Sequence, residues 1–260
     1  MGYSCLVALT HFAEGREEDY NDWYTWVHLR DVMRLGLGVV AAQRFRRSEG
    51  LDHQGVVAYE QPYLCIYEVT EPLAMTLAHG PVFTDEMPIS DAFTSDNASE
   101  VYFDEAASIN NEPGTNGAGD VIIERISSTG CSQRIVEWYL NERLPQLAQL
   151  PEVISASAGV PSDHQMFKQE LSGLCALYRT ADLAATAASW PPIAETNCPD
   201  GFDPSSVSVN SYAPVMDRLT MIDVRNPSDE AATQSRKQRE RLGNRVLTGP
   251  PEGIETDMFD

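Results

Sequence analysis

One ring-crowded stretch, "EEDYNDWYTWVHLRDVMRL" from Glu17 to Leu35, holds the residue types best suited to proton transfer. On a helix, Tyr24 and His28 are four positions apart and Asp31 follows His28 by three, so the three side chains are neighbours on one face. A carboxylate beside an imidazole orients the ring and raises its basicity, which suits a general base working near neutral pH. The spacing therefore predicts Tyr24, His28 and Asp31 as catalytic residues. The alternative is that Trp23 and Tyr24 are core residues and that His28 binds a backbone carbonyl.

Other side chains are candidates for holding an aromatic substrate. In "PYLCIYEV", strand alternation puts Tyr63 and Tyr67 on one face, where they either bind a phenol or pack in a core. Arg44, in the strand expected at "AAQRFRR", could clamp a carboxylate, although a surface ion pair is the simpler role on so acidic a protein. The predicted substrate-binding residues are Tyr20, Trp23, Arg44, Tyr63, Tyr67 and His79.

Known cofactor motifs are missing from the sequence. It contains no HExxH and no clustered His/Asp pattern, so we predict no metal site. It also lacks GxGxxG, a Walker loop and a GxSxG elbow, which disfavours nucleotide cofactors and serine-hydrolase chemistry. The 5 cysteines are widely spaced without a CxxC pair, which favours reduced thiols over a disulfide framework or a structural zinc.

The charge balance limits the partners. With 18 basic and 39 acidic residues the formal charge is −21, which repels nucleic-acid phosphates and anionic membrane surfaces. No apolar run approaches the roughly 20 residues of a transmembrane helix, and the first residues show no signal-peptide pattern. We therefore expect a cytoplasmic protein whose partners are a small molecule or a second copy of the chain, with no nucleic-acid and no membrane partner.

An internal duplication organises the chain. "DWYTWVHLRDVMRL", Asp22–Leu35, aligns with "EWYLNERLPQLAQL", Glu137–Leu150, through a shared W-Y-x4-L at an offset of 115 residues. That offset fits a duplicated domain and is too long for a solenoid repeat. Arg143 stands where the first copy has His28, so a histidine-based site would survive only in the first half.

The flanking patterns repeat as well. Each half reads strand, helix, strand, strand, helix, strand, with second helices near Glu71–Ala78 and Ala181–Trp190. This order predicts an α+β fold of two tandem ferredoxin-like β-α-β-β-α-β units that form an α/β-barrel, followed by a C-terminal arm. The predicted division is a first unit at 1–107, a linker at 108–119, a second, degenerate unit at 120–223 and an arm at 224–260.

The arm is polar, with one helix expected around Ala231–Leu242. It also carries apolar side chains near its end, at Val246, Leu247, Ile254, Met258 and Phe259. These side chains favour an ordered arm that packs on the chain or on a neighbouring subunit.

The segments "AEGREEDYNDWY", "HLRDV" and "GVVAAQRFR" resemble the dimeric α/β-barrel superfamily, near its EthD-like branch. The resemblance covers Tyr3–Asp104 and, more weakly, Asp120–Asp223, and departs from the family where Arg30 replaces the usual proline. It implies a cavity between the first helix and the sheet. It is also compatible with a homodimer formed through the barrel or the arm.

The resemblance leaves three functions open. The first is a cofactor-independent lyase that decarboxylates, opens or cyclises a small phenolic compound, with His28 as general acid/base. The second is a cofactor-free or haem-linked monooxygenase, in which a helical histidine would hold the haem. The third is a non-catalytic small-molecule-binding protein.

Overall fold

The computed structural model describes residues 4–35, 38–49, 51, 61–70, 87–110, 119–163, 165, 172–193 and 196–243. Within these residues the protein is mixed α+β, and all its strand pairs are antiparallel. The helix expected near Glu71–Ala78, and His79 with it, lie outside the described residues. The strands are β1 (Ser4–Phe12), β2 (Val39–Ser48), β3 (Tyr63–Val69), β4 (Phe93–Asn110), β5 (Asp120–Ser127), β6 (Val153–Pro161), β7 (Ser172–Thr180), β8 (Val207–Pro214) and β9 (Leu219–Thr220).

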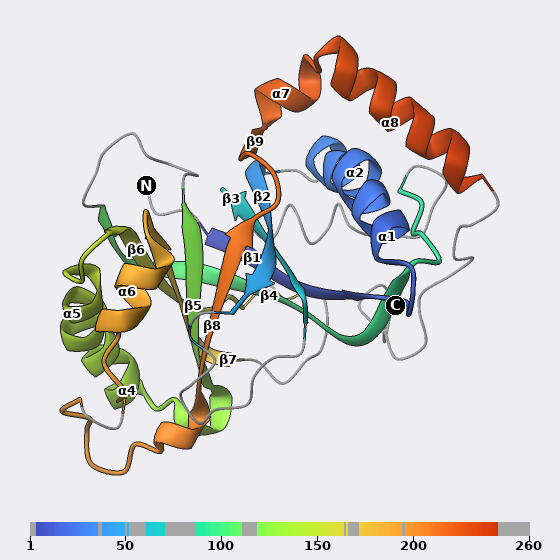
Figure 1. The fold of residues 1–260 in the computed structure, drawn as a ribbon. Coiled ribbons are helices and arrows are strands. Elements are labelled where there is room, and N and C mark those ends of the chain that lie inside the picture. The colour runs from blue at the N-terminus through green and yellow to red at the C-terminus, as the bar shows by residue number, and fades with distance from the viewer. Residues whose placement is uncertain are drawn as a thin grey trace.

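The strand pairings close into a ring (Figure 1). The order is β3-β1-β4-β6-β7-β5-β8-β2, and the pairing of β2 with β3 closes the ring. The short strand β9 pairs with the same edge of β2 as β8 does, nearer the start of β2. Register shifts interrupt five of the nine pairings, so the ring is not a regular barrel. The α+β class is confirmed, and the expected barrel is found as one large antiparallel sheet closed into an irregular ring. Tandem ferredoxin-like units stay a prediction, because strands of both halves belong to one ring.

Strand β4 joins the two halves. Its residues 93–103 pair with β1, and residues 103–110 pair with β6. Gly159 of β6 lies at this seam, where an added Cβ would come within 2.7 Å of the Asp104 carbonyl oxygen. Only glycine allows this close approach of the two strands. Residues 108–110, expected as the start of a linker, are therefore strand.

Each half places a long helical segment on the outer face of its strands. In the first half α1 (Glu17–Trp23), the π-helix η1 (Tyr24–His28) and α2 (Leu29–Leu35) follow one another without a break. Three acidic residues in the first turn of α1 favour its start, because a helix N-terminus carries partial positive charge. In the second half the same succession is α4 (Gln133–Trp138), the π-helix η3 (Tyr139–Arg143) and α5 (Leu144–Ala148), and α6 (Leu183–Ser189) follows β7. The short 3₁₀ helices are η2 (Ser128–Gly130) and η5 (Pro204–Ser206).

Three apolar clusters form the core. One lies between the α1–η1–α2 segment and the face of strands β1, β2, β3 and β4 that this segment covers. A second lies between the helices and the strands of the second half. A third contains residues of both halves, among them Phe45, Phe103 and Tyr212, and fills the inside of the ring. The sheet of each half is therefore packed on both faces.

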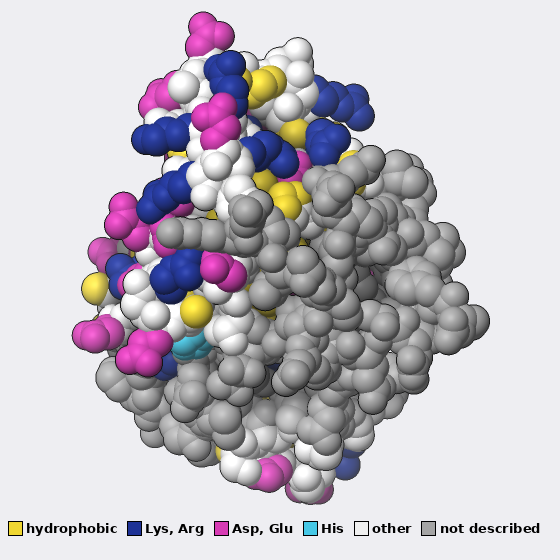
Figure 2. Space-filling model, turned by 90° about the vertical axis from the view of Figure 1, so that its right-hand side faces the viewer, with side chains coloured by type: hydrophobic (Ala, Val, Ile, Leu, Met, Phe, Trp, Pro, Cys, Tyr) yellow, Lys and Arg dark blue, Asp and Glu magenta, His cyan; other side chains and the backbone are white. Residues whose placement is uncertain are grey.

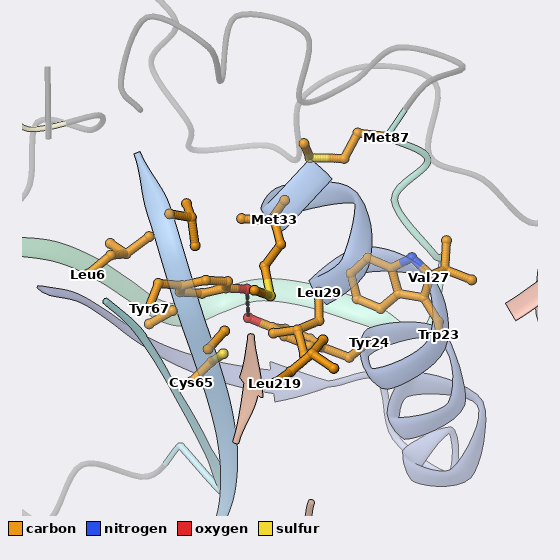
Figure 3. Packing of buried hydrophobic residues seen from close by; sticks show 14 of the residues in the cluster. Leu6, Trp23, Tyr24, Val27, Leu29, Met33, Cys65, Tyr67, Met87 and Leu219 are labelled. Carbon is orange, nitrogen blue, oxygen red and sulfur yellow. Dashed lines mark hydrogen bonds between the residues drawn. The ribbon is translucent and has the colours of Figure 1, made fainter. Parts of the chain in front are cut away.

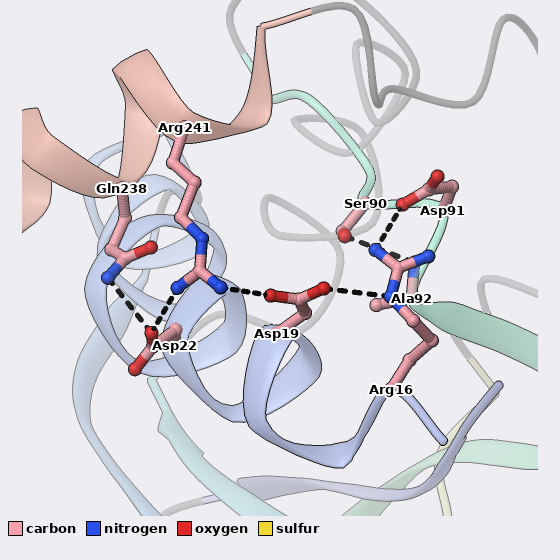
Figure 4. A network of polar contacts seen from close by, with 8 residues as sticks. All are labelled: Arg16, Asp19, Asp22, Ser90, Asp91, Ala92, Gln238 and Arg241. Atoms are coloured by element: carbon pink, nitrogen blue, oxygen red, sulfur yellow. Dashed lines mark hydrogen bonds and ion pairs between the residues drawn. The ribbon is translucent and has the colours of Figure 1, made fainter. Parts of the chain in front are cut away.

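The C-terminal arm returns to the first half as α7 (Met221–Arg225) and α8 (Asp229–Leu242), seen at the top of Figure 1. The Ser228 hydroxyl caps the start of α8 by accepting a hydrogen bond from the backbone N–H of Ala231. Near its end, Arg241 donates to Asp19 at 2.6 Å and to Asp22 at 3.1 Å (Figure 4). The helix expected in the arm is confirmed, and it packs on the α1–η1–α2 segment of its own chain. None of the helices in the described ranges is long and apolar enough to cross a membrane.

Candidate functional site

The predicted aromatic residues of the first half meet beneath the α1–η1–α2 segment. Tyr20 and Tyr24 come from the helix and Tyr63 and Tyr67 from β3, while Trp23 packs beside Tyr20 and Tyr24 and donates to the Pro88 carbonyl at 2.9 Å. All five side chains are at most 2% exposed. The Tyr24 and Tyr67 hydroxyls are 3.1 Å apart and hydrogen-bonded (Figure 3). Helix and strand periodicity thus bring the five rings together, as the sequence predicted.

Burial keeps these phenols neutral. It raises the pKa of Tyr20 to about 12, against the nearby Arg44 charge, which lowers it. Burial also raises the pKa of Tyr24 and of Tyr67 well above the usual value. The hydroxyls are therefore hydrogen-bond donors at neutral pH and not bases.

Arg44 is the most unusual side chain of this region. It is 1% exposed, and its guanidinium lies over the rings of Tyr24, Tyr63 and Tyr20 at 4.3, 5.2 and 5.4 Å. It donates to the Thr25 hydroxyl at 2.6 Å and to the Asn21 side-chain oxygen at 2.9 Å. Within the described part of the chain, no carboxylate lies within ion-pair distance of Arg44. The surface ion pair considered from the sequence is wrong, because the residue faces the helix and not the solvent.

Tyr63 marks the outer edge of this cluster. Its hydroxyl donates to Glu17 at 2.7 Å and accepts from Asn21 at 2.6 Å. Asn21 therefore connects Tyr63 to Arg44, while Arg46 pairs with Glu17 at 3.0 Å on the solvent side.

His28, the last residue of η1, is half-buried between two rings. Its ring centroid is 4.7 Å from that of Trp23 and 4.9 Å from that of Tyr24. The helix thus places His28 beside Tyr24, as its spacing predicted.

Asp31 does not orient His28. The carboxylate is 1% exposed and forms ion pairs with Arg239 of α8 and with Arg34, the latter at 3.4 Å. Burial raises the pKa of Asp31, against the lowering effect of these two arginines. The predicted His28–Asp31 pairing is therefore replaced by an ion pair with Arg34, one helical turn away, and by one with Arg239 of the arm, which helical spacing alone could not reveal.

The sheet adds a residue that sequence reasoning missed. Across β2, β3, β1 and β4, the register aligns Arg44 with Cys65, Cys65 with Ala8, and Ala8 with Glu100. These four residues form a row under the helix, with a cation at one end and a carboxylate at the other. Glu100 is half-buried, and loss of hydration raises its pKa to about 7. The sequence did hold a signal for Glu100. It is two positions from Tyr102 in β4, so strand alternation places both side chains on the same face.

The second half uses the equivalent space differently. Its register pairs Tyr178 with Ile122 and Ala176 with Glu124, so Glu124 stands where the first half has Ala8. Arg143, at the place of His28, donates to both carboxylate oxygens of Glu124 at 3.0 and 3.2 Å. Both side chains are 0% exposed. A closed ion pair fills this interior.

Three cavities whose walls are made of described residues do not border His28, Tyr24 or Arg44. One of about 370 Å³ opens at an end of the ring beside Arg179 and Glu68. One of about 360 Å³ lies between α2 and α8, and a hollow of about 20 Å³ lies at Trp23 and Arg241. Among the residues with known placement, no group of His, Cys, Asp and Glu could hold a metal ion.

No known protein family matches the sequence, and no curated protein does. Solved structures share its fold. An anthrone oxidase-like protein superposes with a TM-score of 0.56 at 10% sequence identity, covering 85% of this chain and 93% of the other. A "Putative monooxygenase" from Fusobacterium nucleatum superposes with a TM-score of 0.52 at 10% identity, covering 84% of this chain and 94% of the other.

These likenesses concern the fold alone. They show that chains with this arrangement of strands and helices occur among solved structures, and membership of the dimeric α/β-barrel superfamily stays a prediction. The EthD-like branch and the reaction stay predictions.

Proposed function

We propose that the chain is a cofactor-independent oxygenase of a small phenolic aromatic compound, bound between the α1–η1–α2 segment and the sheet of the first half. The observation that carries the proposal is Arg44, a buried cation with three tyrosine rings around it and no carboxylate partner among the described residues. A cation in such a place stabilises negative charge that develops on a bound oxygen atom. The neutral hydroxyls of Tyr24 and Tyr67 supply hydrogen-bond donors beside it.

The proposed reaction converts a methylene carbon between two aromatic rings into a carbonyl. Removal of one methylene proton leaves a carbanion whose charge spreads onto the substrate's phenol or ketone oxygen, where Arg44 stabilises it. The carbanion then passes electrons to O₂. One oxygen atom becomes the new carbonyl and the other leaves as water, so CH₂ and O₂ give C=O and H₂O without a further reductant.

Two residues are candidates for the proton acceptor. Glu100 lies in the same cross-strand row as Arg44, and its pKa of about 7 suits a base at neutral pH. His28, the residue predicted from sequence, lies against Tyr24. Glu100 is our choice, because the Asp31 carboxylate expected to raise the basicity of His28 is bound by arginines instead.

The names of the structural neighbours favour the oxygenase alternative over the lyase reading. They are an anthrone oxidase-like protein and one named as a monooxygenase, and neither name points to a lyase. A haem-linked version has less support. A histidine that binds a metal usually donates its other ring N–H to a carboxylate or carbonyl that orients the imidazole. Asp31, the carboxylate nearest to His28 along the helix, binds Arg34 and Arg239 instead.

Substrate binding requires the rings beneath the helix to move, because Tyr24, Tyr67 and Met33 fill that space (Figure 3). The π-helix Tyr24–His28 is suited to such movement. Single π-helical turns inside α-helices are rare, and they are frequent at functional sites.

The test measures oxygen uptake by the purified protein with a three-ring phenolic substrate that carries a central methylene. We expect uptake with the wild type and a loss of about 10²–10³-fold in kcat/KM for Arg44→Met, the range for removing one oxyanion-stabilising donor. Arg179→Met is the matched control, because Arg179 also stacks on a ring, that of Phe45 at 5.6 Å, but lies on another strand away from the tyrosines.

Other results would contradict the proposal. Carbon dioxide release from aromatic acids without oxygen uptake would restore the lyase reading. Binding without turnover would favour a binding protein, and a Soret band in the purified protein would favour haem. Activity lost in Arg179→Met but kept in Arg44→Met would move the site to the cavity at the end of the ring.

The finer fold prediction, a duplicated ferredoxin-like unit, is part of the proposal. The π-helices Tyr24–His28 and Tyr139–Arg143 are offset by 115 residues, as the sequence alignment requires. The tyrosine pair Tyr24–Tyr67 also has a counterpart in Tyr139–Tyr178, at 2.7 Å. A cytoplasmic location and a homodimer stay predictions.

A further inference from the structure

A second candidate binding site lies on the opposite side of α2 from the tyrosines. The cavity between α2 and the arm, which we call the arm cleft, has a volume of about 360 Å³. This volume falls within the roughly 300–1,000 Å³ of small-molecule sites. Its walls come from α2, from the α7–α8 turn and from the first three turns of α8.

The arm cleft is basic on a strongly acidic protein. Four arginines, Arg30, Arg34, Arg236 and Arg239, line it together with two carboxylates, those of Asp31 and Glu240. The lining therefore has two positive charges in excess, on a chain with a formal charge of −21. Figure 2 shows Lys and Arg side chains, with Asp and Glu side chains between them, in its upper part, the level at which Figure 1 places α2, α7 and α8.

Two of these arginines have no ion pair among the described residues, although the Asp223 carboxylate acts on Arg30 from a greater distance. Arg34 and Arg239 bind Asp31, whereas no described carboxylate lies within ion-pair distance of Arg30 or Arg236. The Nε of Arg30 is buried without a hydrogen-bond partner, and its guanidinium lies 5.4 Å over the ring of Trp26. Burial lowers the pKa of Arg30, so an anion placed beside it would restore the interactions that the cation has lost.

The rest of the wall is aliphatic. Val224, Pro227, Ala231 and Ala232 line the cleft between the arginines. A ligand complementary to this surface has an apolar body and one anionic group. We propose that the arm cleft binds a small organic carboxylate, with its carboxylate at Arg30 and Arg236 and its ring or chain against Val224, Pro227 and Ala231.

This site is independent of the proposed oxygenase reaction. It uses α8, which reaches α2 and η1 from the far end of the chain, so a ligand would bridge the two helices. Binding of the ligand would therefore stabilise the docked arm, because a ligand that binds only the folded state raises its stability.

The test uses benzoate as the probe, with benzamide as the uncharged isostere and inorganic phosphate as an anion without an apolar body. We expect benzoate to bind saturably in calorimetry and to raise the Tm. Benzamide and phosphate should bind at least tenfold more weakly. Arg30→Gln and Arg236→Gln should each weaken benzoate binding by about tenfold to a hundredfold, as expected for loss of a charged hydrogen bond.

Arg225→Gln is the matched control, because Arg225 is an exposed arginine of α7 that does not line the cleft. It should bind benzoate like the wild type. Arg236 is exposed on α8, so its variant should fold normally even if Arg30→Gln does not. Benzoate binding that survives in Arg236→Gln, equal binding of benzamide, or binding lost in Arg44→Met instead would each overturn the proposal.

Discussion

The two halves of the molecule fill the same space beneath their helices in opposite ways. In the second half, Arg143 from the π-helix and Glu124 from the first strand of that half neutralise each other in full burial. In the first half the corresponding positions are His28 and Ala8, and the charged groups stand at the ends of a row, as Arg44 and Glu100. A self-neutralised interior has no charge to offer a ligand. The first half, in which Arg44 has no ion pair among the described residues, does have one, and this difference is the main reason to place a site there.

The largest effect that would test this contrast is on stability. Arg143→Met leaves the Glu124 carboxylate buried without its partner, so the free energy of unfolding should fall by about 3–5 kcal/mol. Urea denaturation measures it. Arg44→Met should cost less, because it leaves no buried carboxylate among the described residues unpaired.

The double variant Arg143→Met/Glu124→Leu is the control for this interpretation. It should regain most of the lost stability, because replacing a buried ion pair by apolar side chains is often neutral. If Arg44→Met lowers the free energy of unfolding more than Arg143→Met does, the proposed contrast between the two halves is wrong.

A second effect concerns Glu100 and pH. If its carboxylate is the base, turnover should rise with pH around the midpoint of about 7 and fall by about 10²-fold or more in Glu100→Gln. Rates measured from pH 5 to 9 would show this. A midpoint that persists in Glu100→Gln but disappears in His28→Gln would assign the base to His28.

Glu100 should also make the stability of the fold depend on pH. The pKa of Glu100 is raised from 4.5 to about 7 in the fold, so the folded state holds the proton more tightly than the unfolded state. The contribution of Glu100 to stability should therefore be largest below about pH 4.5 and should fall as the pH rises to about 7. Thermal melts of Glu100→Gln should lack this part of the decrease.

The smallest effect compares the tyrosine pairs. Tyr24→Phe and Tyr139→Phe each remove one buried hydrogen bond, of 3.1 and 2.7 Å, which should lower stability by about 0.5–1.5 kcal/mol. Only Tyr24→Phe should also slow turnover. Equal activity in both variants would remove Tyr24 from the site.

The sequence predicted the parts of the site that depend on local periodicity. The helical spacing put Tyr20, Tyr24 and His28 on neighbouring faces, and strand alternation put Tyr63 with Tyr67. The cross-strand partner of Glu100 depends on the register of β4 against β1, which local patterns do not determine. Of the two partners of Asp31, Arg239 was also beyond reach, because it lies 208 residues away in the chain.

Strand β4 couples the unfolding of the two halves. Because one continuous 18-residue strand is hydrogen-bonded first to β1 and then to β6, neither half has a complete edge of its own. A fragment cut at the middle of this strand would present unpaired amides to other chains and tend to aggregate. The two copies should therefore melt in a single cooperative transition.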